Sequence, residues 1–143
     1  MIRRISMLDV PRVMEIWLNA TIQGHPFISE DYWYGNYDTV KNAWLPSSDT
    51  YVDERDGRVL GFISVIDNTL IGALFVEYEQ QGIGIGTALI NYAKALYSAL
   101  TLEVYKENRS AVRFYRSCGF TVTDEKKAED NDHMLYVMAW KQK

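Results

Sequence analysis

Cysteine, histidine and proline are all scarce in this chain, whose 143 residues include one cysteine, two histidines and three prolines. Cys118 has no partner for an internal disulfide. One cysteine and two histidines are also too few ligands for a Cys/His zinc site, so we expect no metal cofactor. The longest apolar run, Leu70–Val76, is far too short to span a membrane, and no signal-peptide pattern follows the arginines near residue 1. These absences predict a soluble, cytoplasmic protein with a reduced thiol.

Positive charge is also in short supply. Lysine and arginine total 15 against 19 aspartates and glutamates, which gives a formal net charge of −4 at pH 7. A dominant positive field is what draws proteins to nucleic acid and to anionic membranes, so we expect neither as a partner. Hydrophobic residues make up 48% of the chain, an ordinary globular composition. At this length we expect a single domain, residues 1–143.

The hydrophobic period changes along the chain, and the changes predict its helices and strands. Asp9 is expected to cap the first helix and Ser29 the second, and Asp56-Gly57 is a strong hairpin signal. The nearly continuous apolar segment Thr69–Val76 is typical of a central strand buried on both faces. We expect strands at 2–6, 50–55, 58–66, 69–76, 100–105, 120–124 and 134–140, and helices at about 10–24, 29–44, 85–96 and 108–117. This is the order β-α-α-β-β-β-α-β-α-β-β, an α/β (α+β) domain with one mixed sheet.

A glycine-rich stretch, Glu79–Leu89 (EQQGIGIGTAL), comes directly before the third predicted helix. Glycines let a ligand approach the main chain, and a helix N-terminus adds unpaired N–H donors, so such a loop can bind phosphate without a lysine. It is neither a Walker loop, because Gly86 is followed by Thr87, nor a G-x-G-x-x-G fingerprint. Taken alone, the glycines are explained equally well by tight packing of helix on strand.

Two segments together resemble the GNAT (GCN5-related) N-acetyltransferase superfamily. Gln81–Gly86 (QGIGIG) matches its Gln/Arg-x-x-Gly-x-Gly/Ala signature. Leu102–Phe120 (LEVYKENRSAVRFYRSCGF) resembles its second hallmark, in which a strand leads to an asparagine and a helix with Ala-x-x-Phe-Tyr is closed by Gly-Phe. The predicted element order is also that of the family's fold. The chain looks most like the small, single-domain bacterial members, where a His-Pro-Phe-Ile segment also recurs.

The resemblance implies acetyl-CoA as co-substrate. In the family, the strand before the glycine loop splays from its neighbour, and here Phe75 and Val76 would offer their main chain to the pantetheine arm. Asn108 would contact the cofactor from the second half of the fold. The pyrophosphate would bind the loop's N–H groups, those of Gln81, Gly82, Ile83, Gly84, Ile85, Gly86 and Thr87. Ile83 stands where a basic residue is common, and Glu77-Tyr78 replaces a frequent proline, two departures that would weaken the affinity for the cofactor.

Transfer of an acetyl group from a thioester needs a polarised carbonyl and a proton for the departing thiolate. The N–H of Val76 is the candidate donor to the thioester oxygen. Tyr115 falls on the family's Phe-Tyr position, which implies that its phenol is the general acid. Its helical period, shared with Ala111, Phe114 and Cys118, indicates only packing when taken without the resemblance.

A base or proton relay must also deprotonate the attacking amine, whose pKa is about 10 when it is a lysine. Glu103 points away from its strand neighbours Leu102 and Val104, toward the expected cleft, although a solvent-facing charge has the same pattern. His25 lies in the loop after the first helix and has a suitable unperturbed pKa, although it also precedes the turn residue Pro26. We rank the two equally as catalytic candidates, beside a bound water molecule.

The segments 21–29 and 124–132 are expected to border the acceptor site. The second carries five acidic residues against two lysines, and an acidic rim favours cationic amines, although a solvated turn has the same composition. The leading hypothesis is an acetyl-CoA-dependent N-acetyltransferase, a monomer or homodimer, acting on a primary amine such as a protein lysine, an N-terminus or a small amine. The alternatives are a non-catalytic acyl-CoA-binding sensor or partner-binding module, and a nucleotide binder.

Overall fold

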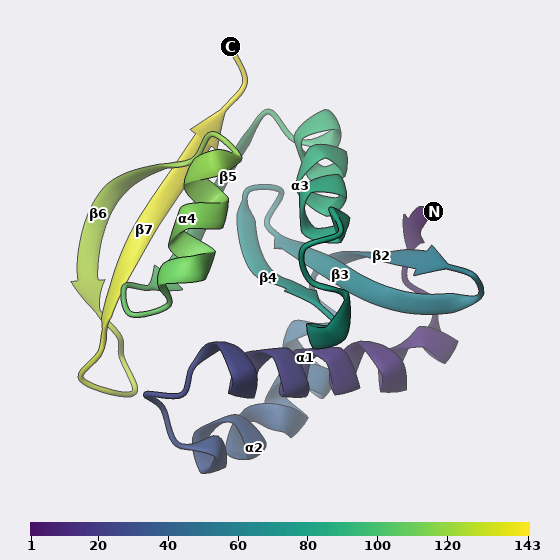
Figure 1. The fold of residues 1–143 in the computed structure, drawn as a ribbon, viewed down its shortest axis with the longest axis horizontal. Coiled ribbons are helices and arrows are strands. Elements are labelled where there is room, and N and C mark those ends of the chain that lie inside the picture. The colour runs from purple at the N-terminus through teal and green to yellow at the C-terminus, as the bar shows by residue number, and fades with distance from the viewer.

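A computed structural model describes residues 1–143 as one mixed seven-stranded sheet with four α-helices (Figure 1). It confirms the predicted α/β architecture and the order of its elements. The strands are β1 (Ile2–Arg4), β2 (Asp49–Arg55), β3 (Arg58–Ile66), β4 (Leu70–Val76), β5 (Ala99–Tyr105), β6 (Thr121–Lys127) and β7 (Met134–Lys141). The helices are α1 (Val10–Gly24), α2 (Glu30–Thr39), α3 (Ile85–Leu96) and α4 (Arg109–Ser117), with short turns of helix at Met7–Asp9, Val40–Trp44 and Tyr78–Gln80.

The sheet has the strand order β1-β2-β3-β4-β5-β7-β6, in which only β4 and β5 are parallel neighbours. Helices α1 and α2 cover one face and α3 and α4 the other (Figure 1). Leu89 of α3 and Leu102 of β5 are buried on the α3/α4 face, while Val13 of α1 and Phe62 of β3 are buried on the opposite face. None of the helices combines the length and the apolar character that crossing a membrane requires.

Two tight turns build the first half of the sheet. Asp56 and Gly57 have φ values of 53° and 78°, and Asp67 and Asn68 have φ values of 53° and 61°. Two successive positive φ values are the mark of type I′ turns, whose twist matches that of the flanking antiparallel strands. The predicted hairpin at Asp56-Gly57 is therefore confirmed, and the second turn joins β3 to β4 in the same way.

The strands β4 and β5 separate soon after they meet. Their register contains only the pairs Leu70↔Thr101 and Ile71↔Leu102, and beyond Ile71 the two strands diverge (Figure 1). The prediction that β4 is buried on both faces is wrong: Ile71 is its one buried residue, and Ala73–Val76 are half-buried. The apolar run is central in the sheet and pairs with β3 throughout, but on the other side its second half borders an opening instead of β5.

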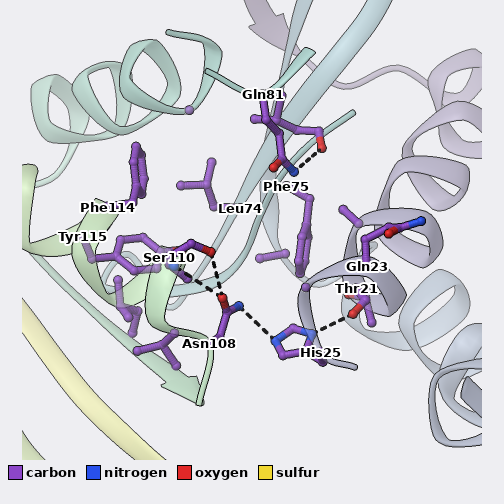
Figure 2. Close-up of a pocket in the computed structure, with 18 of the residues that line it drawn as sticks. Thr21, Gln23, His25, Leu74, Phe75, Gln81, Asn108, Ser110, Phe114 and Tyr115 are labelled. Carbon is purple, nitrogen blue, oxygen red and sulfur yellow. Dashed lines mark hydrogen bonds between the residues drawn. The ribbon is translucent and has the colours of Figure 1, made fainter. Parts of the chain in front are cut away.

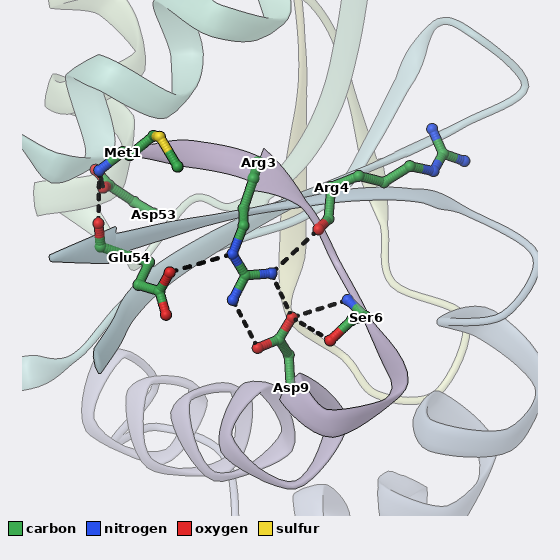
Figure 3. A network of polar contacts seen from close by, with 7 residues as sticks. All are labelled: Met1, Arg3, Arg4, Ser6, Asp9, Asp53 and Glu54. Carbon is green, nitrogen blue, oxygen red and sulfur yellow. Dashed lines mark hydrogen bonds and ion pairs between the residues drawn. The ribbon is translucent and has the colours of Figure 1, made fainter. Parts of the chain in front are cut away.

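Asp9 does not cap α1 as expected, although it occupies the N-cap position. Its carboxylate accepts hydrogen bonds from the N–H and hydroxyl of Ser6, at 2.8 and 3.1 Å, and two from the guanidinium of Arg3, at 2.7 and 3.0 Å (Figure 3). Arg3 also donates to Glu54 at 3.3 Å, so the network fastens β1 to β2 and to the start of α1. Pairing with Arg3 lowers the pKa of Asp9 to about 2.

The substitution Asp9→Asn is expected to lower the free energy of unfolding at pH 7 by about 2 kcal/mol. Because the folded-state pKa of Asp9 is depressed, its contribution is complete above about pH 4 and is lost as the pH falls toward about 2. Urea unfolding of both proteins at pH 7, 4 and 3 measures the effect. Asp38→Asn, at an exposed and unpaired position on α2, is the control. A difference that stays constant across this pH range contradicts the assignment.

Candidate active site

A cleft of about 720 Å³ lies where β4 and β5 diverge (Figure 2). Its walls come from the C-terminal end of α1, β4, the glycine loop, the end of β5 and the first turns of α4. Of its 31 lining residues 17 are hydrophobic, a composition that suits a long, partly apolar ligand held by few polar groups. Both halves of the sheet therefore contribute residues to the walls of one cleft.

The main chain of β4 presents hydrogen-bonding groups to this cleft. The N–H of Glu77 donates to the carbonyl of Leu60 on β3 at 2.8 Å. Because successive peptide groups of a strand point to opposite sides, those of Phe75 also face β3, and those of Leu74 and Val76 face the gap. The side chain of Gln81 donates to the carbonyl of Val76 at 3.4 Å. The N–H of Val76 and the peptide groups of Leu74 remain without a partner beside the gap, where an extended ligand can use them.

Phe75 was expected to offer its main chain to the gap, but its peptide groups face β3. Those of Leu74, which was not expected, face the gap instead. The ring of Phe75 lines the cleft instead (Figure 2) and packs against Phe62, with ring centroids 6.0 Å apart. The alternation of peptide groups could have identified Leu74 only once the pairing of β4 with β3 was known.

The glycine loop carries six consecutive N–H groups, those of residues 82–87, that donate to no acceptor in the chain. Gly82 and Gly84 have φ values of 89° and 91°, and nothing lies within 4 Å of a Cβ placed on either residue. Their backbone conformation, rather than crowding, requires glycine. The N–H of Gln81 is the exception among the expected donors, because it donates to the carbonyl of Tyr78 at 3.4 Å.

Gly86 serves a different purpose from the other two glycines. A Cβ at this position would lie 3.2 Å from the ring of Phe114, so Gly86 lets α3 approach α4. Close packing therefore explains Gly86, although its partner is the helix α4 and not a strand as expected, whereas Gly82 and Gly84 are explained by their backbone conformation. Together the free N–H groups and the positive end of the α3 dipole form a site for an anion such as a diphosphate, with no basic side chain required.

Tyr115 projects into the cleft from α4 (Figure 2). Its ring packs against those of Phe114 and Phe120, with centroids 5.4 and 5.8 Å away, and its hydroxyl makes no hydrogen bond with the protein. Burial raises the pKa of Tyr115 well above the usual value for a phenol. A phenol is protonated at neutral pH even at its usual pKa of about 10, so the hydroxyl is available to donate to a group bound in the cleft.

His25 and Asn108 meet at the end of the cleft that lies between α1 and α4 (Figure 2). His25 Nδ1 lies 2.7 Å from the carbonyl oxygen of Thr21, which can only accept, so this nitrogen carries the proton. His25 Nε2 is then the acceptor for Asn108 Nδ2 at 3.3 Å. The side-chain oxygen of Asn108 accepts in turn from the N–H of Ala111 at 3.3 Å and caps α4. The pair thus ties the end of α1 to the start of α4.

The surroundings of His25 argue against the expected role as a base. The residue is 8% exposed and packs against Trp33 and Tyr105, with centroids 5.1 and 5.3 Å away. Burial lowers the pKa of His25, and both ring nitrogens are engaged. A neutral imidazole with no free nitrogen suits the positioning of Asn108 better than proton transfer. Trp33 and Tyr105 also line the cleft. The sequence marks Trp33 only as one of four closely spaced aromatic residues at 32–37, too dense for one helix face, and it does not mark Tyr105.

Glu103 lines the cleft with an exposed side chain. Leu102 and Val104, its neighbours on β5, are buried on the α3/α4 face of the sheet. The strand alternation therefore places the side chain of Glu103 on the opposite face, pointing away from these two neighbours as expected. Its carboxylate forms an ion pair with Lys126 of β6 at 2.6 Å. Of the two candidate bases, this is the one that a bound amine or water molecule can reach.

The expected acidic loop at 124–132 is shorter than predicted, because β6 continues through Lys127. Lys126 and Lys127 pair with Glu103 and Asp132, which offsets part of the negative charge. Tyr32 of α2 donates to Asp130 at 2.8 Å, so the turn between β6 and β7 docks against α2. At the other border, Thr21 and His25 line the cleft within the expected segment 21–29.

Comparison with known protein families matches residues 25–141 to the acetyltransferase (GNAT) domain. The peptidyl-lysine N-acetyltransferase YiaC of Escherichia coli (strain K12) is 35% identical over 140 residues, covering 98% of this chain and 96% of that protein. The peptidyl-lysine N-acetyltransferase YjaB of the same organism is 31% identical over 131 residues, covering 90% and 87%.

Solved structures show the same fold. The solution structure of apo YjaB from Escherichia coli superposes with a TM-score of 0.86 at 27% identity, covering 100% of this chain and 98% of that one. The PaiA N-acetyltransferase of Thermoplasma acidophilum, solved in complex with coenzyme A, gives a TM-score of 0.83 at 22% identity, covering 99% and 98%.

Proposed function

This chain belongs to the GNAT acetyltransferase family, and on that basis we propose that it transfers the acetyl group of acetyl-CoA to a primary amine, foremost that of a protein lysine. The observation that carries the proposal is the set of unpaired main-chain groups on two sides of one cleft, on β4 and at residues 82–87. The names of the relatives YiaC and YjaB, both peptidyl-lysine N-acetyltransferases, support lysine as the acceptor.

Acetyl-CoA fits the cleft in sections. The peptide groups of Leu74 and Val76 suit the amides of the pantetheine arm, which can bind beside β4 as an additional short strand. The free N–H groups of residues 82–87 suit the diphosphate. This arrangement leaves the thioester near Tyr115 and the acceptor end near Asn108, on the far side of the cleft from the glycine loop.

The reaction then needs few protein groups. The amine nitrogen attacks the thioester carbon, and one of the two free N–H groups of β4, that of Leu74 or Val76, stabilises the negative charge that develops on the carbonyl oxygen. As the carbon–sulfur bond breaks, Tyr115 donates its proton to the departing thiolate and later recovers one from solvent. Glu103 attracts the substrate ammonium into the cleft and accepts its proton, directly or through a water molecule. Asn108, held by His25, fixes the start of α4 against the cofactor.

His25→Ala is expected to raise the KM for acetyl-CoA about fivefold, which corresponds to the loss of one neutral hydrogen bond that orients Asn108. The acidic limb of the pH profile of kcat/KM should keep its midpoint, since His25 is neutral and does not transfer the proton. Steady-state kinetics from pH 6 to 9 measure both. The control is His133→Ala, which removes the other histidine, paired with Glu107 at 2.6 Å outside the cleft. Loss of the acidic limb together with a fall in kcat of about 100-fold would restore His25 as the base.

The proposed function is tested by incubating the protein with acetyl-CoA and a panel of lysine peptides and small amines, with release of free thiol as the readout. Thermal stabilisation by acetyl-CoA together with amine-dependent thiol release supports the proposal. Stabilisation without release from any amine favours the acyl-CoA sensor instead. Stabilisation by ATP or NAD but not by acetyl-CoA overturns the acetyltransferase and indicates a nucleotide binder.

A further inference from the structure

A row of three arginines lies on the outer face of α4. Arg109, Arg113 and Arg116 are spaced at i, i+4 and i+7, which places them on one side of the helix. All three are exposed, and none forms a hydrogen bond or an ion pair within the chain. They line a second groove of about 720 Å³, together with Phe27 and Lys106. Such a concentration of unpaired positive charge stands out in a chain of net charge −4.

Two other charged side chains line this groove. Lys106 pairs with Glu125 of β6 at 2.9 Å. Glu107, the one acidic residue that lines the groove, accepts a hydrogen bond from His133 at 2.6 Å. Counted as a full negative charge, Glu107 is still outnumbered by the three guanidinium groups, so the local potential is positive.

The groove begins beside the acceptor end of the cleft. The ring centroid of Phe27, which lines the groove, is 5.7 Å from that of His25 and 5.7 Å from that of Tyr105, both of which line the cleft. Helix α4 separates the two hollows: its Phe114–Tyr115 side faces the cleft, and its arginine side faces the groove. A polypeptide that crosses Phe27 can thus place one residue in the cleft and its neighbours along the arginines.

We propose that this groove, the arginine groove, binds an acidic segment of the protein substrate and so directs the enzyme to lysines with aspartates or glutamates a few residues away. The inference rests on the proposed lysine acetylation. Guanidinium groups bind carboxylates through paired hydrogen bonds. Seven helical residues span about 10 Å, the length of about three extended residues, so a short acidic segment suffices. Nucleic acid fits less well, because a longer polyanion would also meet the acidic β6–β7 turn (Glu129, Asp130 and Asp132).

The test uses two peptides that share a central lysine and differ only in four flanking residues, either acidic or serine. The wild-type protein is expected to acetylate the acidic peptide with a kcat/KM about tenfold higher at low salt, and the difference should shrink at high salt. The triple variant R109Q/R113Q/R116Q should lose this preference while its activity on the serine peptide and its KM for acetyl-CoA stay at wild-type values. K41Q/K141Q/K143Q, which removes the same charge elsewhere, should keep the preference.

Binding of the fluorescently labelled acidic peptide, measured by anisotropy, tests the arginine groove independently of turnover. The wild-type protein should bind it about tenfold more tightly than the arginine variant does, even if no peptide is acetylated, so a failure of the proposed reaction remains distinguishable. Equal binding of the acidic and serine peptides by the wild type, or a preference that survives in the arginine variant, overturns the inference. Competition by single-stranded RNA with no effect of the acidic peptide assigns the groove to nucleic acid and overturns it as well.

Discussion

We expect Tyr115→Phe to lower kcat for amine acetylation by about 100-fold, within the range that general acids contribute, while acetyl-CoA binds with unchanged affinity. The phenol lines the cleft, makes no hydrogen bond with the protein and is protonated at neutral pH, where burial raises its pKa further. Removal of one oxygen preserves the ring packing against Phe114 and Phe120. Thiol release at saturating substrates measures kcat, and calorimetry measures the Kd of acetyl-CoA.

The matched control is Tyr92→Phe on α3, where the ring packs against Tyr51 with centroids 5.1 Å apart and does not line the cleft. It should acetylate amines at the wild-type rate. A Tyr115→Phe variant that does the same removes Tyr115 from the mechanism and leaves its position explained by packing alone. A fall in acetyl-CoA affinity equal to the fall in rate would instead make Tyr115 a binding residue.

The order of elements was readable from the sequence because each element is specified by its own residues. Asp56-Gly57 and Asp67-Asn68 tolerate positive φ values and so form the two tight turns. Ser29 accepts from the N–H of Asp31 at the start of α2, as expected of a capping serine. Turn and capping signals of this kind depend only on residues within about four positions of each other, so they can be read from a single sequence.

Features that depend on distant partners could not be predicted in this way. The divergence of β4 from β5 was expected from the family resemblance alone, because it leaves no mark in Leu70–Val76, whose apolar run looks the same whether or not a strand pairs with its second half. The carboxylate of Asp9 could have capped α1, but Arg3 holds it. Spacing also does not distinguish Gly84, required by its backbone, from Gly86, required by the ring of Phe114.

In the candidate site, too, local motifs could be read from the sequence and contacts between distant residues could not. The glycine loop and Tyr115 were found from motifs because their residues are close in sequence. The occupation of both ring nitrogens of His25 was not readable, since its partner Asn108 lies 83 residues further along the chain. The main-chain donors of β4 were placed at Phe75 instead of Leu74, because the phase of a strand's peptide groups follows from its pairing with β3 and not from its side chains.

Gly84→Ala is expected to weaken acetyl-CoA binding about tenfold, because a left-handed conformation costs an L-residue about 1–2 kcal/mol. Gly84 has a φ of 91° at the N-cap of α3. Nothing lies within 4 Å of the added methyl group, so the effect arises from the backbone and not from a clash. The exposed loop can relieve the strain by turning its peptide groups, which moves the free N–H groups of residues 82–87 away from the diphosphate. Calorimetric titration with acetyl-CoA measures the change in Kd.

The control for Gly84→Ala is Gly35→Ala, since a Cβ at Gly35 also meets nothing within 4 Å and its φ lies outside the positive range. Gly35 lies within α2, so alanine should leave the Kd unchanged and favour the helix by up to about 1 kcal/mol. Equal affinities for all three proteins would mean that the loop does not hold the diphosphate. Because no lysine or arginine lies in residues 77–89, the loop then has no other group to do so, and binding of acetyl-CoA would have to depend on β4 and α4 alone.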